Sequence, residues 1–101
     1  MILYNITFKV DPSIEAAWLK WQREEHIPEI LSSGIFLEHT MYRLLEQDDF
    51  DGATYVIQFR AEGIKEYQEF LDVFAPELRQ KSFNKWGDRF IAFRSVMEVI
   101  H

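Results

Sequence analysis

The chain has 101 residues, a formal net charge of −6 at pH 7 and no cysteine. The acidic balance disfavours binding to nucleic-acid phosphates, and the lack of thiols excludes a disulfide framework and a thiolate metal site. No apolar run approaches the roughly 20 residues of a membrane helix, and no signal peptide is recognised at the start. The absence of cysteine fits a reducing cytoplasm. The hydrophobic content of 48%, with 16% aromatics, predicts one folded domain over residues 1–101.

Residues 2–10 alternate between apolar and polar side chains, which predicts a strand. Asp11-Pro12-Ser13 then begins a helix, because Asp and Ser cap helices and Pro suits the first turn. At about 100° per residue, one face of this helix carries a stripe of apolar residues that continues to Glu25. The stripe consists of Ile14, Ala17, Trp18 and Trp21. Pro28 predicts an end or a kink near residues 26–27, followed by a short turn and a stop at Gly34.

Three further strands are predicted, at residues 35–46, 53–60 and 90–100. A polar loop at residues 47–52, ending in Asp-Gly, joins the first two as a hairpin. After Gly63 the apolar residues recur at helical spacing, which predicts a second helical region. We expect Pro76 to divide this region and Gly87 to end it. The whole chain therefore has the element order β-α-β-β-α-β.

This order predicts a ferredoxin-like α+β fold with a four-stranded antiparallel sheet, of the dimeric α/β-barrel type. An unrelated α+β sandwich with the same order is the alternative. Helices can cover only one face of such a sheet, and the other face would be covered by a second copy in a homodimer. By strand parity, we expect that open face to carry Leu3, Asn5, Thr7, Val56, Gln58, Phe90, Ala92, Arg94 and Val96.

Five segments together resemble one family of short bacterial proteins, catalogued as domain of unknown function number forty-two eighty-six. They are LYNITF at 3–8, WLKWQREEHIPEIL at 18–31, Gly34, TYVIQF at 54–59 and FAPELRQKSFNKWGDRFIAFRSV at 74–96. The most specific motifs are Glu25-His26-Ile27-Pro28, Ala75-Pro76-Glu77-Leu78-Arg79 and Phe93-Arg94, taken together. The resemblance covers essentially the whole chain and implies no particular activity.

The element order is also similar to that of the dimeric α/β-barrel superfamily. The superfamily includes cofactorless monooxygenases, haem-degrading enzymes, polyketide cyclases and ligand-binding modules, so the likeness does not select one chemistry. Asn5 resembles an Asn of the haem-degrading members. Those members also place a haem-ligating His in the late helical region, and residues 75–86 here contain none.

Glu25 and His26 are the candidate catalytic residues. Glu25 at the end of a tryptophan-bearing stripe would be partly desolvated, which would raise its pKa and make it a general base. It could equally be a solvated helix-end residue or pair with Arg43. His26 could transfer a proton at a cavity rim or interact only with the helix C-terminus. No metal-ligand spacing surrounds them, so we expect no metal and no cofactor.

The candidate ligand-binding residues are Asn5, Trp18, Trp21, Arg43, Gln58 and Arg94. An Arg on an enclosed face needs a partner, which could be a substrate carboxylate or an acidic residue of the chain, and this holds for Arg79 as well. The function predicted is a small homodimer that binds a small organic molecule in a cavity beside the sheet. The alternatives are a cofactorless monooxygenase, isomerase or cyclase, and a protein-interaction module without a ligand.

Overall fold

The structure is a computed structural model that describes residues 1–46 and 48–101. Its elements are β1 (Ile2–Val10), α1 (Glu15–Trp21), η1 (Gln22–His26), α2 (Ile27–Leu31), β2 (Phe36–Arg43), β3 (Ala53–Ala61), α3 (Ile64–Glu69), η2 (Phe70–Phe74), α4 (Ala75–Trp86) and β4 (Phe90–Glu98), where η marks a π-helical segment. The predicted element order is confirmed. The second and fourth strands are shorter than predicted, and the predicted loop 47–52 begins at Gln47, which lies outside the described residues.

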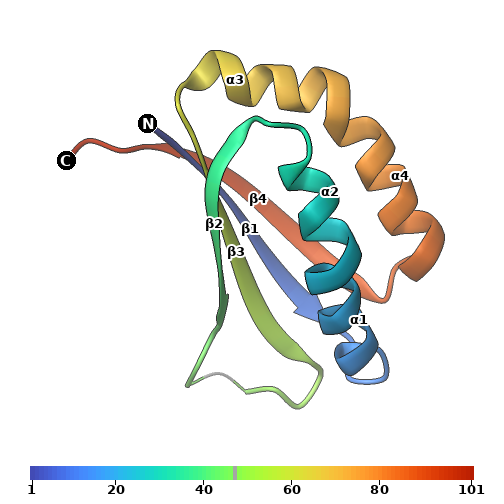
Figure 1. Cartoon of the computed structure of the whole chain (residues 1–101). Helices are drawn as coiled ribbons and strands as arrows, with labels where there is room; N and C mark the ends of the chain where they lie inside the picture. The colour runs from blue at the N-terminus through green and yellow to red at the C-terminus, as the bar shows by residue number, and fades with distance from the viewer. Residues whose placement is uncertain (47) are drawn as a thin grey trace.

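The four strands form one antiparallel sheet in the order β2-β3-β1-β4. The central strand β1 pairs with β3 on one side and with β4 on the other, so that Ile6 lies opposite Ile57 and Arg94. Both helical rods, α1–α2 and α3–α4, lie across the same face of the sheet (Figure 1). This two-layer arrangement is the ferredoxin-like fold that the sequence predicted.

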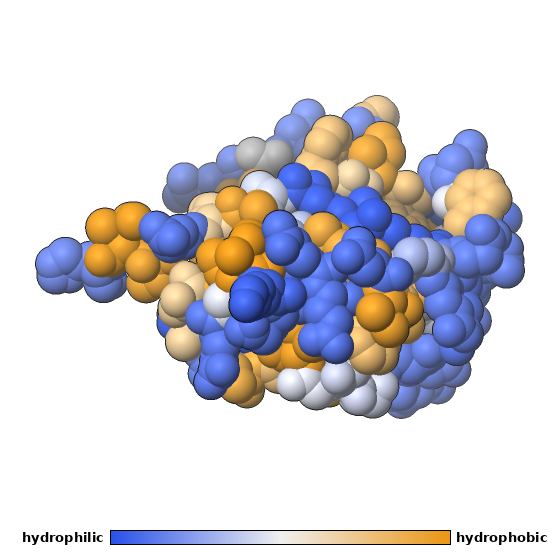
Figure 2. Space-filling model, turned by 90° about the horizontal axis from the view of Figure 1, so that it is seen from above, coloured by the Kyte–Doolittle hydropathy of each residue, from blue (hydrophilic) through white to orange (hydrophobic). Residues whose placement is uncertain are grey.

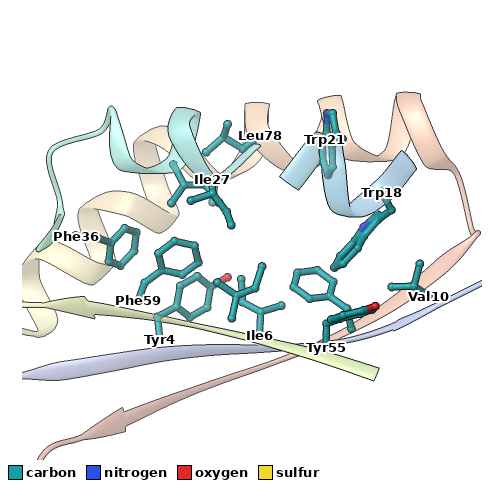
Figure 3. Packing of buried hydrophobic residues seen from close by; sticks show 14 of the residues in the cluster. Tyr4, Ile6, Val10, Trp18, Trp21, Ile27, Phe36, Tyr55, Phe59 and Leu78 are labelled. Atoms are coloured by element: carbon teal, nitrogen blue, oxygen red, sulfur yellow. The ribbon is translucent and has the colours of Figure 1, made fainter. Parts of the chain in front are cut away.

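The core fills the space between the sheet and the helices. Every second residue of β1, from Ile2 to Val10, is buried, as the period of a strand requires. Trp18 of α1 is completely buried and its ring lies 5.0 Å from that of Phe8. Figure 3 shows Tyr4 reaching from the sheet towards the helices and Trp18 pointing down from α1. Aromatic rings from both layers therefore make up much of this interior.

Both helical rods contain a π-helical segment just before a proline. The N–H of Ile27 donates to the carbonyl of Gln22, five residues back, and the N–H of Ala75 donates to the carbonyl of Phe70 in the same way. These wide turns precede Pro28 and Pro76, whose rings would clash with the carbonyl four residues earlier in a regular helix. The first rod therefore continues through Pro28 to Leu31 instead of ending near residue 27 as predicted.

The predicted face of β4 is wrong. The register pairs Phe90 with Val10, Ala92 with Phe8 and Arg94 with Ile6, so these residues and Val96 lie on the helix-covered side. The parity of an isolated strand does not reveal which face is buried, because β4 is an edge strand that is mostly exposed on both faces. The open face carries the other set, Ile91, Phe93, Ser95 and Met97, beside Leu3, Asn5 and Thr7.

The open face of the sheet is exposed and partly apolar. Phe93 is 65% exposed and Ile91 is 56% exposed. Seen from above, apolar and polar groups are interspersed on the surface, and the apolar chain end beyond β4 projects to the left (Figure 2). Among the described residues, no helix has the length and apolar character needed to cross a membrane.

Candidate functional site

A cavity lies between the sheet and the two helical rods, and aromatic rings form much of its wall. Its lining residues are Tyr4, Ile6, Phe8, His26, Ile30, Phe70, Ala75, Leu78, Arg79, Ser82, Phe90 and Arg94. Its void is about 30 Å³, which is enough for one or two water molecules. The rings of Phe8 and Phe90 lie 5.7 Å apart in an edge-to-face arrangement.

The cavity adjoins a groove between α4 and the edge strand β4. The groove has a volume of about 270 Å³ and shares Arg79, Ser82, Phe90 and Arg94 with the cavity. The cavity alone is far smaller than the roughly 300 Å³ at which small-molecule sites begin, so a ligand would lie mainly in the groove. The two arginines therefore stand at the junction between an aromatic interior and a groove open to solvent.

Arg79 and Arg94 bring two positive charges to this junction. The guanidinium of Arg79 donates a long hydrogen bond of 3.4 Å to the hydroxyl of Tyr4. Within the described residues the ion pairs involve other cations, and neither of these arginines has a carboxylate within 4 Å. Burial and the neighbouring Tyr4 raise the pKa of Tyr67, and the positive charges of Arg79 and Arg94 oppose this rise.

His26, the last residue of η1, is the titratable group of the cavity wall. Its imidazole stacks on the Trp21 ring with 4.4 Å between the ring centres. Burial lowers the pKa of His26 to about 4; the carboxylate of Glu29 opposes this shift and the positive charge of Arg94 adds to it. The imidazole is therefore neutral at pH 7, so it can accept as well as donate a hydrogen bond.

The structure does not bring Glu25 to this site. In the wide turn of η1, successive buried positions are five residues apart. Gln22 and Ile27 are therefore buried, and Glu25 between them is exposed. Glu25 lines a separate surface hollow together with Trp21, Lys85 and Trp86. The predicted placement of Glu25 at the end of the buried stripe is wrong, because a regular period of 3.6 residues was assumed across a π-helical turn.

The other predicted ligand residues are divided among three places. Asn5 and Gln58 lie opposite each other on the open face of the sheet, where the amide of Gln58 donates to Asn5 at 3.1 Å. Arg43 pairs with Asp49 of the hairpin at 2.8 Å, so its partner is an acidic residue of the chain other than Glu25. Of the predicted set only Arg94 lines the cavity.

Trp18 and Trp21 belong to the buried cluster above the sheet. Trp21 supports the cavity indirectly, because His26 stacks on it. Sequence reasoning did not identify Tyr4, Ser82 or Gln22. Tyr4 and Ser82 each bring a hydroxyl group to the cavity wall from a buried position. Gln22 is a buried polar residue that follows two tryptophans in the sequence. That last pattern is visible in the sequence, because Gln22 follows Trp18 by four residues and so shares its helical face.

Solved structures with the same architecture have very different sequences. An ethyl tert-butyl ether d (ethd) family protein from Bacillus halodurans matches with a TM-score of 0.72 at 11% identity, over 99% of this chain and 100% of that chain. SnoaB, a cofactor-independent oxygenase from Streptomyces nogalater, matches with a TM-score of 0.66 at 11% identity, over 99% and 93%. These likenesses show a common fold and leave the chemistry open.

A third structure is a dimeric ferredoxin-like protein from an uncultured marine organism, with a TM-score of 0.72 at 16% identity, over 100% of this chain and 96% of that chain. No curated protein matches the sequence. The family described as "Domain of unknown function (DUF4286)" matches residues 1–100, almost the full length. The resemblance inferred from the sequence is thus confirmed, and the chain belongs to the DUF4286 family, within the ferredoxin-like fold.

Proposed function

We propose that the protein binds a small organic anion, most simply an aromatic carboxylate, in the cavity and its adjoining groove. The observation that carries the proposal is the pair of arginines, Arg79 and Arg94, which lack a carboxylate partner in the described chain and stand at the mouth of an aromatic cavity. Few polar groups on an apolar wall are the usual composition of a small-molecule site. The arginines orient the anion, and the rings contact the rest of the molecule.

The position of the arginines favours a ligand over a purely structural role. Other basic residues are neutralised by acidic residues of the chain: Arg60 pairs with Glu38 at 2.8 Å and Lys9 pairs with Asp51 at 2.7 Å. Arg79 and Arg94 have no such partner among the described residues. An Arg fork can hold a carboxylate through two parallel hydrogen bonds. Because both arginines remain exposed to solvent at the groove, each contact should contribute modestly, about 1 kcal/mol.

The experiment is a calorimetric titration with benzoate and 2-naphthoate, compared with their uncharged methyl esters. We expect the acids to bind and the esters to bind at least tenfold more weakly. Arg94→Gln and Arg79→Gln should each weaken the acids about fivefold, while the esters are unaffected. Arg23→Gln is the matched control, because Arg23 is an exposed residue of η1 outside the cavity. Equal binding of acids and esters would contradict the proposal.

A second candidate function is cofactor-independent proton transfer, which the neutral imidazole of His26 favours. An anion held by the arginines would partly cancel their charge, and this would make His26 a stronger base than in the free protein. Hydrogen exchange from a carbon acid bound in D₂O, followed by NMR, tests this candidate. His26→Phe should abolish the exchange and leave binding in place, whereas exchange at the parent rate would exclude His26 as the base.

We also propose that two copies associate through their open sheet faces. The support is the exposed apolar set of β4, chiefly Ile91, Phe93 and Met97, together with the description of two structural neighbours as dimeric ferredoxin-like proteins. Large exposed apolar patches are characteristic of interaction surfaces. The hydrogen-bonded pair of Asn5 and Gln58 would then lie in the interface instead of the ligand cavity.

A further inference from the structure

The groove between α4 and β4 is positively charged, although the chain as a whole has a net charge of −6. Its polar lining residues are Arg79, Ser82 and Arg94, and the rest of its described lining is apolar or Gly87. No acidic residue is among the described residues of this lining. Two like charges at one groove repel each other, so a ligand with two negative charges would neutralise the groove better than a ligand with one.

Ser82 is a buried polar residue whose hydroxyl has no partner in the described chain. The residue is only 8% exposed, and it lines both the cavity and the groove. The hydroxyls of Ser32 and Ser33 donate to helix carbonyls three residues back, at 2.6 Å and 2.7 Å. That of Ser82 makes no hydrogen bond within the described residues. Because buried hydroxyls are normally paired, this one is left for a group that enters the groove.

The three polar groups reach the groove from two sides. Arg79 and Ser82 are three residues apart, so they lie one turn apart on the same side of α4. Arg94 comes from β4, on the face of the sheet that the helices cover. Phe83, which is 64% exposed, lines the groove together with Phe90. The groove therefore offers three hydrogen-bond donors and, beside them, aromatic surface for a ring.

We propose that the anion bound in this groove is a phosphoryl group, held by Arg79, Ser82 and Arg94, and that the ligand is a small aromatic phosphate monoester. This inference rests on the proposed function and specifies its ligand class. A carboxylate has two oxygens, which the two guanidinium groups would occupy, so it leaves the Ser82 hydroxyl without an acceptor. A phosphate monoester has a third oxygen for Ser82 and a charge of about −1.5 to −2 at pH 7. The ring of the ligand lies in the groove against Phe83, since the cavity void of about 30 Å³ has room only for water.

The test is a calorimetric titration of the parent protein with benzoate, phenyl sulfate and phenyl phosphate, at about pH 7.5, where a phosphate monoester is dianionic. Phenyl sulfate has the three terminal oxygens of the phosphate but a single charge, so the series separates the third oxygen from the second charge. We expect phenyl phosphate to bind about tenfold more tightly than benzoate, with phenyl sulfate between them. Inorganic phosphate, which lacks the ring, should bind more weakly than phenyl phosphate, and equal binding would overturn the assignment of an aromatic ligand.

Ser82→Ala is the informative variant. Ala is a better helix former than Ser, so the variant should fold. It should weaken the binding of phenyl phosphate and phenyl sulfate about fivefold and leave that of benzoate unchanged. Ser95→Ala is the matched control, because Ser95 follows Arg94 in the chain but lies on the open face of β4, opposite Asn5. This control should change the binding of none of the three anions.

A second measurement does not depend on a variant. In ¹⁵N-labelled parent protein, phenyl phosphate should shift the Nε–H signals of Arg79 and Arg94 and leave that of Arg23 in place. If benzoate binds through Arg94 but phenyl phosphate binds no more tightly, or if Ser82→Ala weakens all three anions equally, the groove takes carboxylates. The proposed function then stands and this inference is overturned. If none of the anions binds to the parent, the proposed function fails, and this inference fails with it.

Discussion

Replacement of His26 by Phe should make the stability of the protein less sensitive to acid. The folded chain holds His26 with a pKa of about 4, because burial disfavours the charged ring. In the unfolded chain the pKa returns to about 6.5. The unfolded state therefore takes up the proton first as the pH falls, so unfolding becomes easier between about pH 6.5 and pH 4. Below about pH 4 both states are protonated, and no further loss arises from this group.

The two pKa values determine the magnitude. Between about pH 7.5 and pH 5 the His26 equilibrium should lower the free energy of unfolding by about 2 kcal/mol, and by about 3 kcal/mol once both states are fully protonated. The ring keeps some contact with solvent, which screens its charge, so these values are upper figures. The His26→Phe variant would keep an aromatic ring against Trp21, which His26 contacts at 4.4 Å, without a titrating nitrogen.

The assay is a urea titration of the parent and of His26→Phe at about pH 7.5 and about pH 5. Carboxylates also titrate in this range, so the informative quantity is the difference between parent and variant in the stability lost. His39→Phe is the matched control, because His39 is an exposed imidazole of β2. Should the parent and His26→Phe lose the same stability between the two pH values, the imidazole is not desolvated in solution and the description of the cavity wall is wrong.

Trp18→Ala should lower the free energy of unfolding by roughly 3–5 kcal/mol in a urea titration, because Trp18 is completely buried; a loss under about 1 kcal/mol would show that the ring is exposed in solution. Gly52→Ala should cost roughly 1–3 kcal/mol in a thermal melt, since φ is +134° and a Cβ would lie 2.2 Å from the Val10 carbonyl oxygen; an unchanged melting temperature would contradict that backbone geometry. If the proposed dimer forms through the open face, Phe93→Asp should convert it to a 12.1 kDa monomer in light scattering, while Phe50→Asp in the hairpin should not; a Phe93→Asp protein that stays dimeric would exclude the open face.

Local sequence patterns were sufficient for the strands and their order. The alternation of residues 2–10 matches β1 at both ends, because a half-buried central strand must place every second side chain in the core. Of the predicted stripe, Ile14, Trp18 and Trp21 are buried and mark the inner face of the first helix, whereas Ala17 is exposed. The family was also recognisable from these segments, and the match over residues 1–100 confirms it.

The candidate site depended on features that no local pattern contains. The π-helical turn after Gln22 moved the next buried position of the first rod to Ile27 and left Glu25 exposed, since one wide turn changes the phase of every later residue. The register of β4 on β1 placed Arg94 under the helices, although the strand itself is exposed on both faces. Only tertiary packing, which decides which face of an edge strand is covered, could bring Arg94 to the same cavity as Arg79 and His26.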